Sequence, residues 1–303
     1  MPSKFDFEDC KVEAFCVAYG AGSDEMHLAV PLEPDVQELL VDALIETYAG
    51  LTGLKGEDEW SEFEVSENPK GVSALRAETN DEVFARIRTI FEMAGRNVSI
   101  EEFGKRLGEI SYYYAIFRDG SERRVIGFRQ ARRIRASVKA RYVLISESLR
   151  LVREKVFHLD PQFDFIVGRS EILALSAHSL ESIAGIEQFL KEKYQERAKA
   201  LARSVPQVDW SAIAKYANDR TRAQRLLIAL SRRRDLKNLN PKLLGSVLTA
   251  NKCQFTHVNN CFAPKPNFEM SFLEVLEGRR WPHDITGGGP ILYRASNRSV
   301  VQG

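Results

Sequence analysis

The chain of 303 residues has no hydrophobic run long enough to cross a membrane. A bilayer-spanning helix needs about 20 apolar residues, whereas the best candidate, the apolar run 226–230, is short and flanked by arginines. The N-terminus carries acidic residues where a secretory signal carries an apolar core. We therefore expect a cytoplasmic protein, for which any membrane association must come through a partner.

Cysteine is scarce, with four residues at positions 10, 16, 253 and 261 and no Cys-x-x-Cys pair. Cys253, His257 and Cys261 come nearest to a metal-binding set, but a fourth ligand at zinc spacing is missing. We predict reduced thiols, with neither a metal site nor a cofactor.

Catalytic motifs are also missing. Gly287-Gly288-Gly289 is not followed by the Lys-Ser/Thr of a phosphate-binding P-loop. The sequence has no Gly-x-Ser-x-Gly nucleophile elbow and no His-Glu-x-x-His zinc motif, and its five histidines are scattered. These absences favour a protein without catalytic residues over an enzyme.

The charge distribution is strongly asymmetric, although the net charge is only +1. Residues 1–110 contain 10 Lys and Arg against 24 Asp and Glu, whereas residues 111–303 contain 33 against 18. This split predicts two domains with different partners. We expect residues 1–110 to make protein contacts and residues 111–303 to bind a polyanion, of which nucleic acid is the commonest. A fragment of residues 111–303 is then expected to bind DNA by itself.

Hydrophobic periodicity predicts an α+β fold in both domains. In the acidic domain, strands at 11–20 and 26–31 precede a helix from Pro34 to about Gly50, and Asn80-Asp81-Glu82 begins another helix. Short strands are expected near 62–66 and 72–77, with a further short helix from Asn97.

In the basic domain, Asp119-Gly120 predicts a hairpin between strands 112–117 and 124–128, which opens an antiparallel meander. Helices are expected to follow the meander. A last hairpin pairing 291–294 with 298–301 is also predicted. The further strands are expected at 142–145, 149–152, 155–158, 163–167 and 172–176, and the helices at 186–203, 210–218, 222–233 and 241–251.

Two basic clusters are the candidate DNA-binding surface. Helical spacing places Ala223, Leu226, Leu227 and Leu230 on a buried stripe and the neighbouring arginines away from it, which suits phosphate oxygens. Alternatively, these arginines form an ordinary solvated face or complement a helix C-terminus. The first cluster comprises Arg129, Arg132, Arg133, Arg135, Lys139 and Arg141, and the second comprises Arg222, Arg225, Arg232, Arg233, Arg234 and Lys237.

Base-specific readout is not predicted, because zinc-finger, basic-zipper and helix-turn-helix patterns are missing. Stacking of bases on Tyr112-Tyr113-Tyr114 is a lesser alternative to their packing in the core. The enzymatic alternative is a metal-dependent nuclease that uses Asp160, Asp164 and Glu171, although the Glu-x-Lys of such nucleases is not present at Glu171. If the protein is not a nuclease, we expect Asp164 to have a structural role. A third possibility is a scaffold whose basic face meets acidic protein or anionic lipid.

Five segments carry structural, not catalytic, signatures, namely 114–120, 128–131, 156–167, 272–281 and 293–295. Through these segments, residues from about 112 to 301 resemble the KwaB-like proteins of the Kiwa anti-phage defence system. The acidic domain matches that family only in size and position.

The resemblance implies a cytoplasmic effector subunit that acts with a small membrane-spanning partner, KwaA. In that family the subunit binds DNA without sequence preference and hinders phage DNA replication and transcription. The resemblance does not identify binding residues in this chain. We also expect self-association, most simply as a homodimer.

Overall fold

The computed structural model divides the chain into two compact units. The first, called here the sheet unit, comprises Met1–Glu62 and Lys70–Gly185, and the second, the helical unit, comprises Phe63–Pro69 and Ile186–Gly303. The structure describes residues 5–20, 25–53, 61–67, 74–92, 96–97, 109–131, 141–145, 148–152, 159–283 and 291–294.

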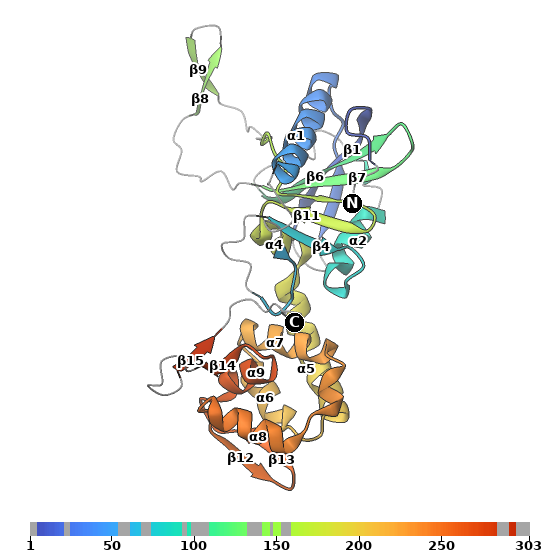
Figure 1. Ribbon diagram of the computed structural model, residues 1–303. Helices are drawn as coiled ribbons and strands as arrows, with labels where there is room; N and C mark the ends of the chain where they lie inside the picture. Colours follow the sequence, from blue (N-terminus) through green and yellow to red (C-terminus); the bar gives the residue numbers. More distant parts are fainter. Residues whose placement is uncertain are drawn as a thin grey trace. The chain divides into compact units, whose positions relative to one another are not determined.

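A nine-stranded sheet forms the centre of the sheet unit (Figure 1). Strands β6, β7, β10 and β11 pair antiparallel in that order, which confirms part of the predicted meander, whereas the strands at 141–145 and 148–152 form a separate pair. The pairs β3–β4 and β2–β5 are parallel. Across the sheet the order is β3 (Ser61–Glu62), β4 (Leu75–Glu78), β11 (Glu171–Ala174), β10 (Phe165–Val167), β7 (Arg124–Gln130), β6 (Ile110–Asp119), β1 (Cys10–Tyr19), β2 (Met26–Ala29) and β5 (Arg96–Asn97).

The pairing of β1 with β6 crosses the domain boundary predicted at residue 110. Cys16 lies opposite Tyr114 and Phe15 opposite Ala115, so segments on both sides of that boundary belong to one sheet. The compact units instead divide between Gly185 and Ile186. The charge composition changes near residue 110, but charge does not determine which strands pair, because pairing depends on the apolar faces that strands share.

Helices cover both faces of this sheet. Helix α1 (Pro34–Thr52) places Leu40 and Leu44 in one core with Phe15 and Tyr113. The helix runs past the predicted end at Gly50, and the amide of its C-cap residue, Gly53, donates to the Ala49 carbonyl.

The opposite face is covered by α4 (Ala177–Ala184), which contacts β7 and also α2 (Ala85–Glu92). A 3₁₀ turn, η3 (Glu82–Phe84), precedes α2, and the predicted start signal is confirmed because the Asp81 carboxylate accepts a hydrogen bond from the Val83 amide at 3.0 Å. Sequence patterns did not predict α4, which begins at a Ser176 cap.

The hairpin predicted at Asp119-Gly120 joins β6 to β7. The last pair is Arg118 with Arg124, so the connection is a five-residue loop, and Glu122 has the positive φ of 62°. The Asp119 carboxylate accepts hydrogen bonds from the Ser121 and Arg123 amides and so stabilises the turn.

Three further strand pairs of the described residues lie outside the large sheet. Strands β8 (Arg141–Ile145) and β9 (Ser148–Val152) pair as predicted. Strand β15 (Ile291–Arg294) pairs with β14 (Arg280–His283), and residues 298–301, the other half of the predicted hairpin, lie outside the described residues. The predicted strand 155–158 and the helix from Asn97 lie largely outside the described residues.

The helical unit has a core of its own, to which α5, α6, α7 and α9 contribute buried side chains such as Tyr194, Trp210, Leu227 and Phe272. Helix α8 packs beside a short hairpin of β12 and β13. The helices are α5 (Ile186–Ser204), α6 (Trp210–Ala217), α7 (Thr221–Arg232), α8 (Pro241–Ala250) and α9 (Glu269–Leu276), with a 3₁₀ turn η5 (Asp235–Asn238), and the strands are β12 (Phe255–Val258) and β13 (Cys261–Pro264).

The four helices predicted for this part of the chain are confirmed to within one or two residues at each end, and α9 follows them. Together with the meander they confirm the α+β class. Within the described ranges, no helix combines the length and the apolar character needed to cross a bilayer.

Candidate nucleic-acid interface

The second basic cluster lies on α7 and on the connection from α7 to α8. Ala223, Leu226, Leu227 and Leu230 are buried as predicted, and they fix which side of α7 faces the core. The helix ends at Arg232, Arg233 is extended, and η5 follows before α8 begins. The connection between α7 and α8 therefore runs along the outside of the helical unit.

Three of the predicted residues are exposed on this connection, namely Arg232, Arg234 and Lys237. Arg232 also lines a cavity of about 420 Å³ together with Glu64 and Val65. Arg234 precedes η5 and Lys237 lies on it, and both extend the positive surface beyond the end of α7. Long cationic side chains at the surface are suited to phosphate contacts, because they reach oxygens without being desolvated beforehand.

Arg233 lies between these residues but has a structural role. Its Nη1 donates to the Leu276 carbonyl at 2.8 Å, and its Nε donates to the Asp235 carboxylate at 3.1 Å. Asp235 raises the pKa of the guanidinium above its ordinary value. Arg233 thus ties the connection to the end of α9.

Arg222 and Arg225 differ in burial although both lie on α7. The side chain of Arg222 is about half exposed, and its Nη2 lies 3.0 Å from the buried Glu274 carboxylate. Arg225 is buried, contrary to the helical spacing, which placed it away from the core stripe. The sequence pattern of α7 gave no sign of what covers it.

The residues that cover Arg225 come from the strap, the segment 63–67, which belongs to the helical unit despite its position in the acidic part of the sequence. Arg225 Nη1 donates to the Val65 carbonyl at 3.2 Å and to the Glu67 carbonyl at 3.1 Å. Hydrogen bonds to buried carbonyls hold the guanidinium in place, so Arg225 stabilises the fold.

A second buried arginine, Arg279, holds the same strap. Its Nη2 donates to the Ser66 hydroxyl at 2.7 Å and lies 3.7 Å from the Glu67 carboxylate. Its side chain is only 2% exposed, so its charge depends on these partners. Sequence analysis missed this role, because the partners are more than 200 residues apart.

The first basic cluster is described only in part. Arg129 on β7 is paired with two carboxylates, with Nε 3.1 Å from Asp160 and Nη1 2.8 Å from Asp164, and its side chain is 15% exposed. Arg141 begins β8, and Arg132, Arg133, Arg135 and Lys139 lie outside the described residues. Of this cluster, the structure therefore gives contacts for Arg129 alone.

The carboxylates of the nuclease alternative are paired with arginines. Asp160 and Asp164 both contact Arg129, and Glu171 on β11 lies 3.1 Å from Arg76 Nη2 on β4. Asp164 also accepts a hydrogen bond from the Gln130 amide at 2.8 Å. Over the ranges that the structure covers, no group of three or more His, Cys, Asp or Glu side chains is arranged to hold a metal ion.

The three tyrosines considered for base stacking are buried, each at 2% exposure or less. Tyr113 faces the α1 side with Phe15, whereas Tyr112 and Tyr114 face the other side with Phe128, as strand alternation predicts. These rings pack in the core of the sheet unit.

A buried polar network accompanies Tyr114. Its hydroxyl lies 3.2 Å from His27 Nδ1, and His27 Nε2 lies 3.2 Å from the Glu25 carboxylate. Arg86 on α2 also bonds Glu25 through Nε at 3.1 Å. Burial raises the pKa of Glu25, but the hydrogen bonds from His27 and Arg86 outweigh it and hold that pKa below the ordinary value. Sequence analysis treated His27 as isolated, because its partners come from other elements.

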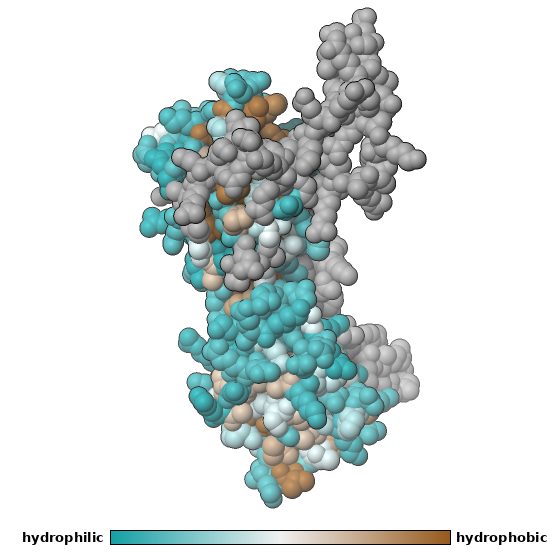
Figure 2. Space-filling model, turned by 180° about the vertical axis from the view of Figure 1, so that it is seen from behind, coloured by the Kyte–Doolittle hydropathy of each residue, from teal (hydrophilic) through white to brown (hydrophobic). Residues whose placement is uncertain are grey.

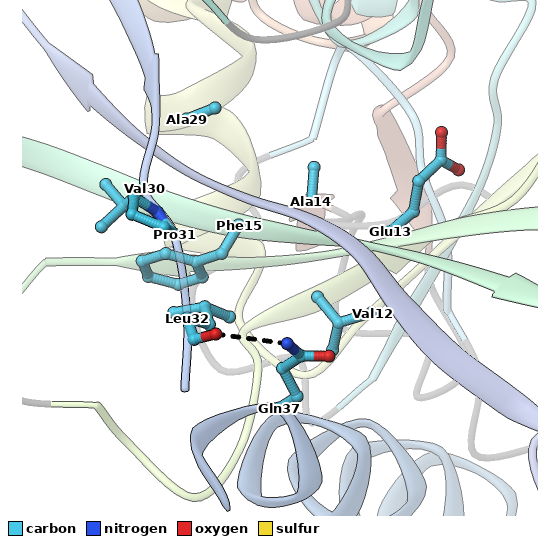
Figure 3. A pocket seen from close by; sticks show the side chains of 9 residues that line it. All are labelled: Val12, Glu13, Ala14, Phe15, Ala29, Val30, Pro31, Leu32 and Gln37. Atoms are coloured by element: carbon cyan, nitrogen blue, oxygen red, sulfur yellow. Dashed lines mark hydrogen bonds between the residues drawn. The ribbon is translucent and has the colours of Figure 1, made fainter. Parts of the chain in front are cut away.

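A cavity of about 380 Å³ lies at the edge of β1, between that strand and the segment that leads into α1 (Figure 3). Val12, Phe15, Val30 and Leu32 contribute apolar surface, and the Gln37 amide donates to the Leu32 carbonyl at 3.3 Å. Its one acidic side chain, Glu13, is engaged by Arg118 and Arg124. This lining contains no nucleophile with an adjacent base, and it does not indicate a catalytic site.

Comparison with known protein families places most of the chain in a defence-related family. The family described as "Kiwa protein KwaB-like" matches residues 107–286, which is more than half of the chain. No curated protein and no solved structure matches the chain.

Proposed function

Because the chain belongs to the KwaB-like family of Kiwa proteins, which gives it a Kiwa-related defence role alongside other subunits, we propose that it acts by binding DNA without sequence preference. On this proposal, the bound protein hinders replication and transcription of phage DNA. The contact surface is the connection between α7 and α8, with Arg232, Arg234 and Lys237 as its phosphate ligands.

The observation that carries this proposal is the exposure of these three cations in a unit with a surplus of positive charge. Phe63–Pro69 and Ile186–Gly303 together contain 20 Lys and Arg against 12 Asp and Glu. Such a surplus attracts a polyanion over distances of about one screening length, roughly 10 Å at 0.1 M salt. The first basic cluster, Arg132, Arg133, Arg135, Lys139 and Arg141, is proposed to add phosphate contacts.

The test is a mobility-shift titration of the full chain with duplexes of several sequences. Reversal of Arg232, Arg234 and Lys237 to Glu is expected to weaken binding to all duplexes alike. The slope of log affinity against log salt is expected to fall by about 0.9 for each phosphate that the variant no longer neutralises. Equal affinity of this variant and the unmodified chain would contradict the proposed surface.

A matched control changes the same net charge elsewhere in the helical unit. Lys199, Arg203 and Lys215 are exposed on α5 and α6, and their reversal to Glu is expected to have a smaller effect. If both triple variants lose affinity equally, the long-range field of the unit binds DNA rather than a defined surface. Titrations with and without Mg²⁺ separate binding from cleavage, since fragments would support the nuclease that uses Asp160, Asp164 and Glu171.

We further propose that the chain is recruited to the inner membrane by a KwaA-like membrane protein and acts as a homodimer. The acidic residues 1–110 are the proposed site of protein contacts. Asp35, Glu38 and Asp42 lie on α1, and Glu38 is exposed beside Leu39, which is 62% exposed. Reversal of the three acidic residues to Lys is expected to abolish co-purification with the membrane protein and leave DNA affinity intact. Retention of the partner would exclude this face of α1.

A further inference from the structure

The outer face of α8 is unusually apolar for a helix on the surface. Leu244 and Leu248 point into the core, whereas Leu243 is 64% exposed and Val247 is 44% exposed. A surface helix normally carries charged residues on its outer face. Lys242 is the one charged residue between Pro241 and Ala250, so α8 presents aliphatic side chains to solvent.

The β12–β13 hairpin adds to this apolar surface. Val258, next to its turn, is 65% exposed, and the turn residues Asn259 and Asn260 have φ values of 50° and 60°. Helix α8 packs on the hairpin, because the Phe262 ring lies 3.4 Å from the position that a Cβ atom on Gly245 would occupy. Figure 2 shows apolar surface at the end of the helical unit where the hairpin lies.

The charge within the sequence segment that contains these side chains has one sign. Residues 236–268 include no Asp or Glu, although 28% of the whole chain is charged. The four cations of this stretch are all exposed. They are Lys237, Lys242, Lys252 and Lys265.

We propose that α8 and the β12–β13 hairpin form a peripheral contact for an anionic lipid surface. Apolar side chains that enter the region between headgroups and acyl chains, surrounded by lysines, are the combination by which proteins lie on membranes. DNA alone does not account for Leu243, Val247 and Val258, because phosphate contacts use cationic and polar groups. A symmetric contact with a second copy would bring the same lysines against one another.

Sedimentation of the purified full chain with lipid vesicles tests this contact. The chain is expected to bind vesicles that contain phosphatidylglycerol and to remain free with phosphatidylcholine alone. Binding is expected to weaken with added salt, because the lysine contribution is screened. Equal binding to both vesicles, or to neither, would overturn the proposal.

Substitutions on α8 test whether this helix makes the lipid contact. The double variant Leu243→Ser, Val247→Ser is expected to lower vesicle affinity by about tenfold, because two aliphatic side chains no longer enter the lipid. Leu39→Ser on α1 removes an equally exposed leucine and is expected to have no effect. Vesicle binding by the double variant at the level of the unmodified chain would overturn the proposal, even if anionic vesicles are bound.

This contact is separable from DNA binding. The Leu243→Ser, Val247→Ser variant is expected to bind DNA as the unmodified chain does, whereas reversal of Arg234 affects DNA. Parallel sedimentation-velocity runs detect a second copy as occupant. Loss of self-association in the double variant, with no vesicle binding by the unmodified chain, would assign this face to the dimer and reject the lipid contact.

Discussion

The sheet unit and the helical unit differ in their balance of cationic and acidic residues. Met1–Glu62 with Lys70–Gly185 has 23 Lys and Arg against 30 Asp and Glu, whereas the helical unit has 20 against 12. In the helical unit, Arg234 and Lys237 are exposed on the α7–α8 connection. In the sheet unit, ion pairs join Arg76 to Glu171, Arg86 to Glu25, Arg123 to Asp119, and Arg129 to Asp160 and Asp164.

The comparison shows that a basic run in a sequence indicates a binding surface only when the carboxylates that fold against it are known. Arg129 and Arg225 both lie in basic stretches, yet Arg129 is paired and Arg225 is buried against the strap. Surplus charge over a whole folded unit is therefore a better guide than local density. Four predictions test this contrast.

The largest effect is expected from removal of residues 1–110. The sequence alone suggested that residues 111–303 would bind DNA unaided. In the structure, that fragment lacks β1, which pairs along β6, and the strap, which satisfies Arg225 and Arg279. We expect the fragment to show no cooperative thermal unfolding by circular dichroism. A cooperative transition like that of the full chain would show that neither contact is needed.

The second-largest effect is expected on the free energy of unfolding when a buried arginine of the helical unit, in place of an exposed one, is substituted. Arg279→Ala is expected to lower the free energy of unfolding by about 3 kcal/mol, because a buried ion pair loses its cation. Arg234→Ala is the control, with an expected change within about 0.5 kcal/mol. Urea unfolding measures both, and equal effects would remove the distinction between the two kinds of arginine.

A smaller effect is expected at Asp164 in the sheet unit. Asp164→Asn weakens the contacts with Arg129 and the Gln130 amide, which is expected to lower the free energy of unfolding by about 1–2 kcal/mol. DNA affinity of the folded variant is expected to survive. Unchanged stability with loss of a Mg²⁺-dependent cleavage activity would favour the nuclease.

The smallest effect concerns the pH dependence of the sheet unit. Because the folded-state pKa of Glu25 lies below its ordinary value of 4.5, its contribution is present above that value and lost as pH falls through the folded-state pKa. Glu25→Gln is expected to reduce the loss of stability on acidification by about 1 kcal/mol or less. Urea unfolding across the acidic range measures this loss, and Glu38→Gln, at an exposed position, is the control. An identical pH profile of the unfolding free energy for both variants would contradict a stabilising role of the Glu25 contacts with His27 and Arg86.

Local elements were predictable because their signals lie in neighbouring residues. The apolar spacing of α7 and the turn signal at Asp119-Gly120 each identified an element, and the structure confirms both. Contacts between distant segments were not predictable. The pairing of β1 with β6 depends on surfaces that meet only in the folded chain.

In the candidate interface, too, features set by neighbouring residues were predictable and features set by distant residues were not. Exposure of Arg234 and Lys237 followed from their position beyond the end of an amphipathic helix. Burial of Arg225 did not follow from α7, because its partners are carbonyl groups about 160 residues earlier in the chain. Backbone carbonyls occur in every residue, so no sequence pattern marks them as partners.

The strap also gives the two units a fixed order of completion during synthesis. The last strand of the sheet ends at Ala174, so its strands are all made before α5 begins. Ser66 is separated from Arg279 by 213 residues, a distance that translation covers in about ten to forty seconds. Arg225 is synthesised 160 residues after Val65 and is the first partner available to the strap, whereas the contacts of Arg279 with Ser66 and Glu67 form only when the end of α9 arrives.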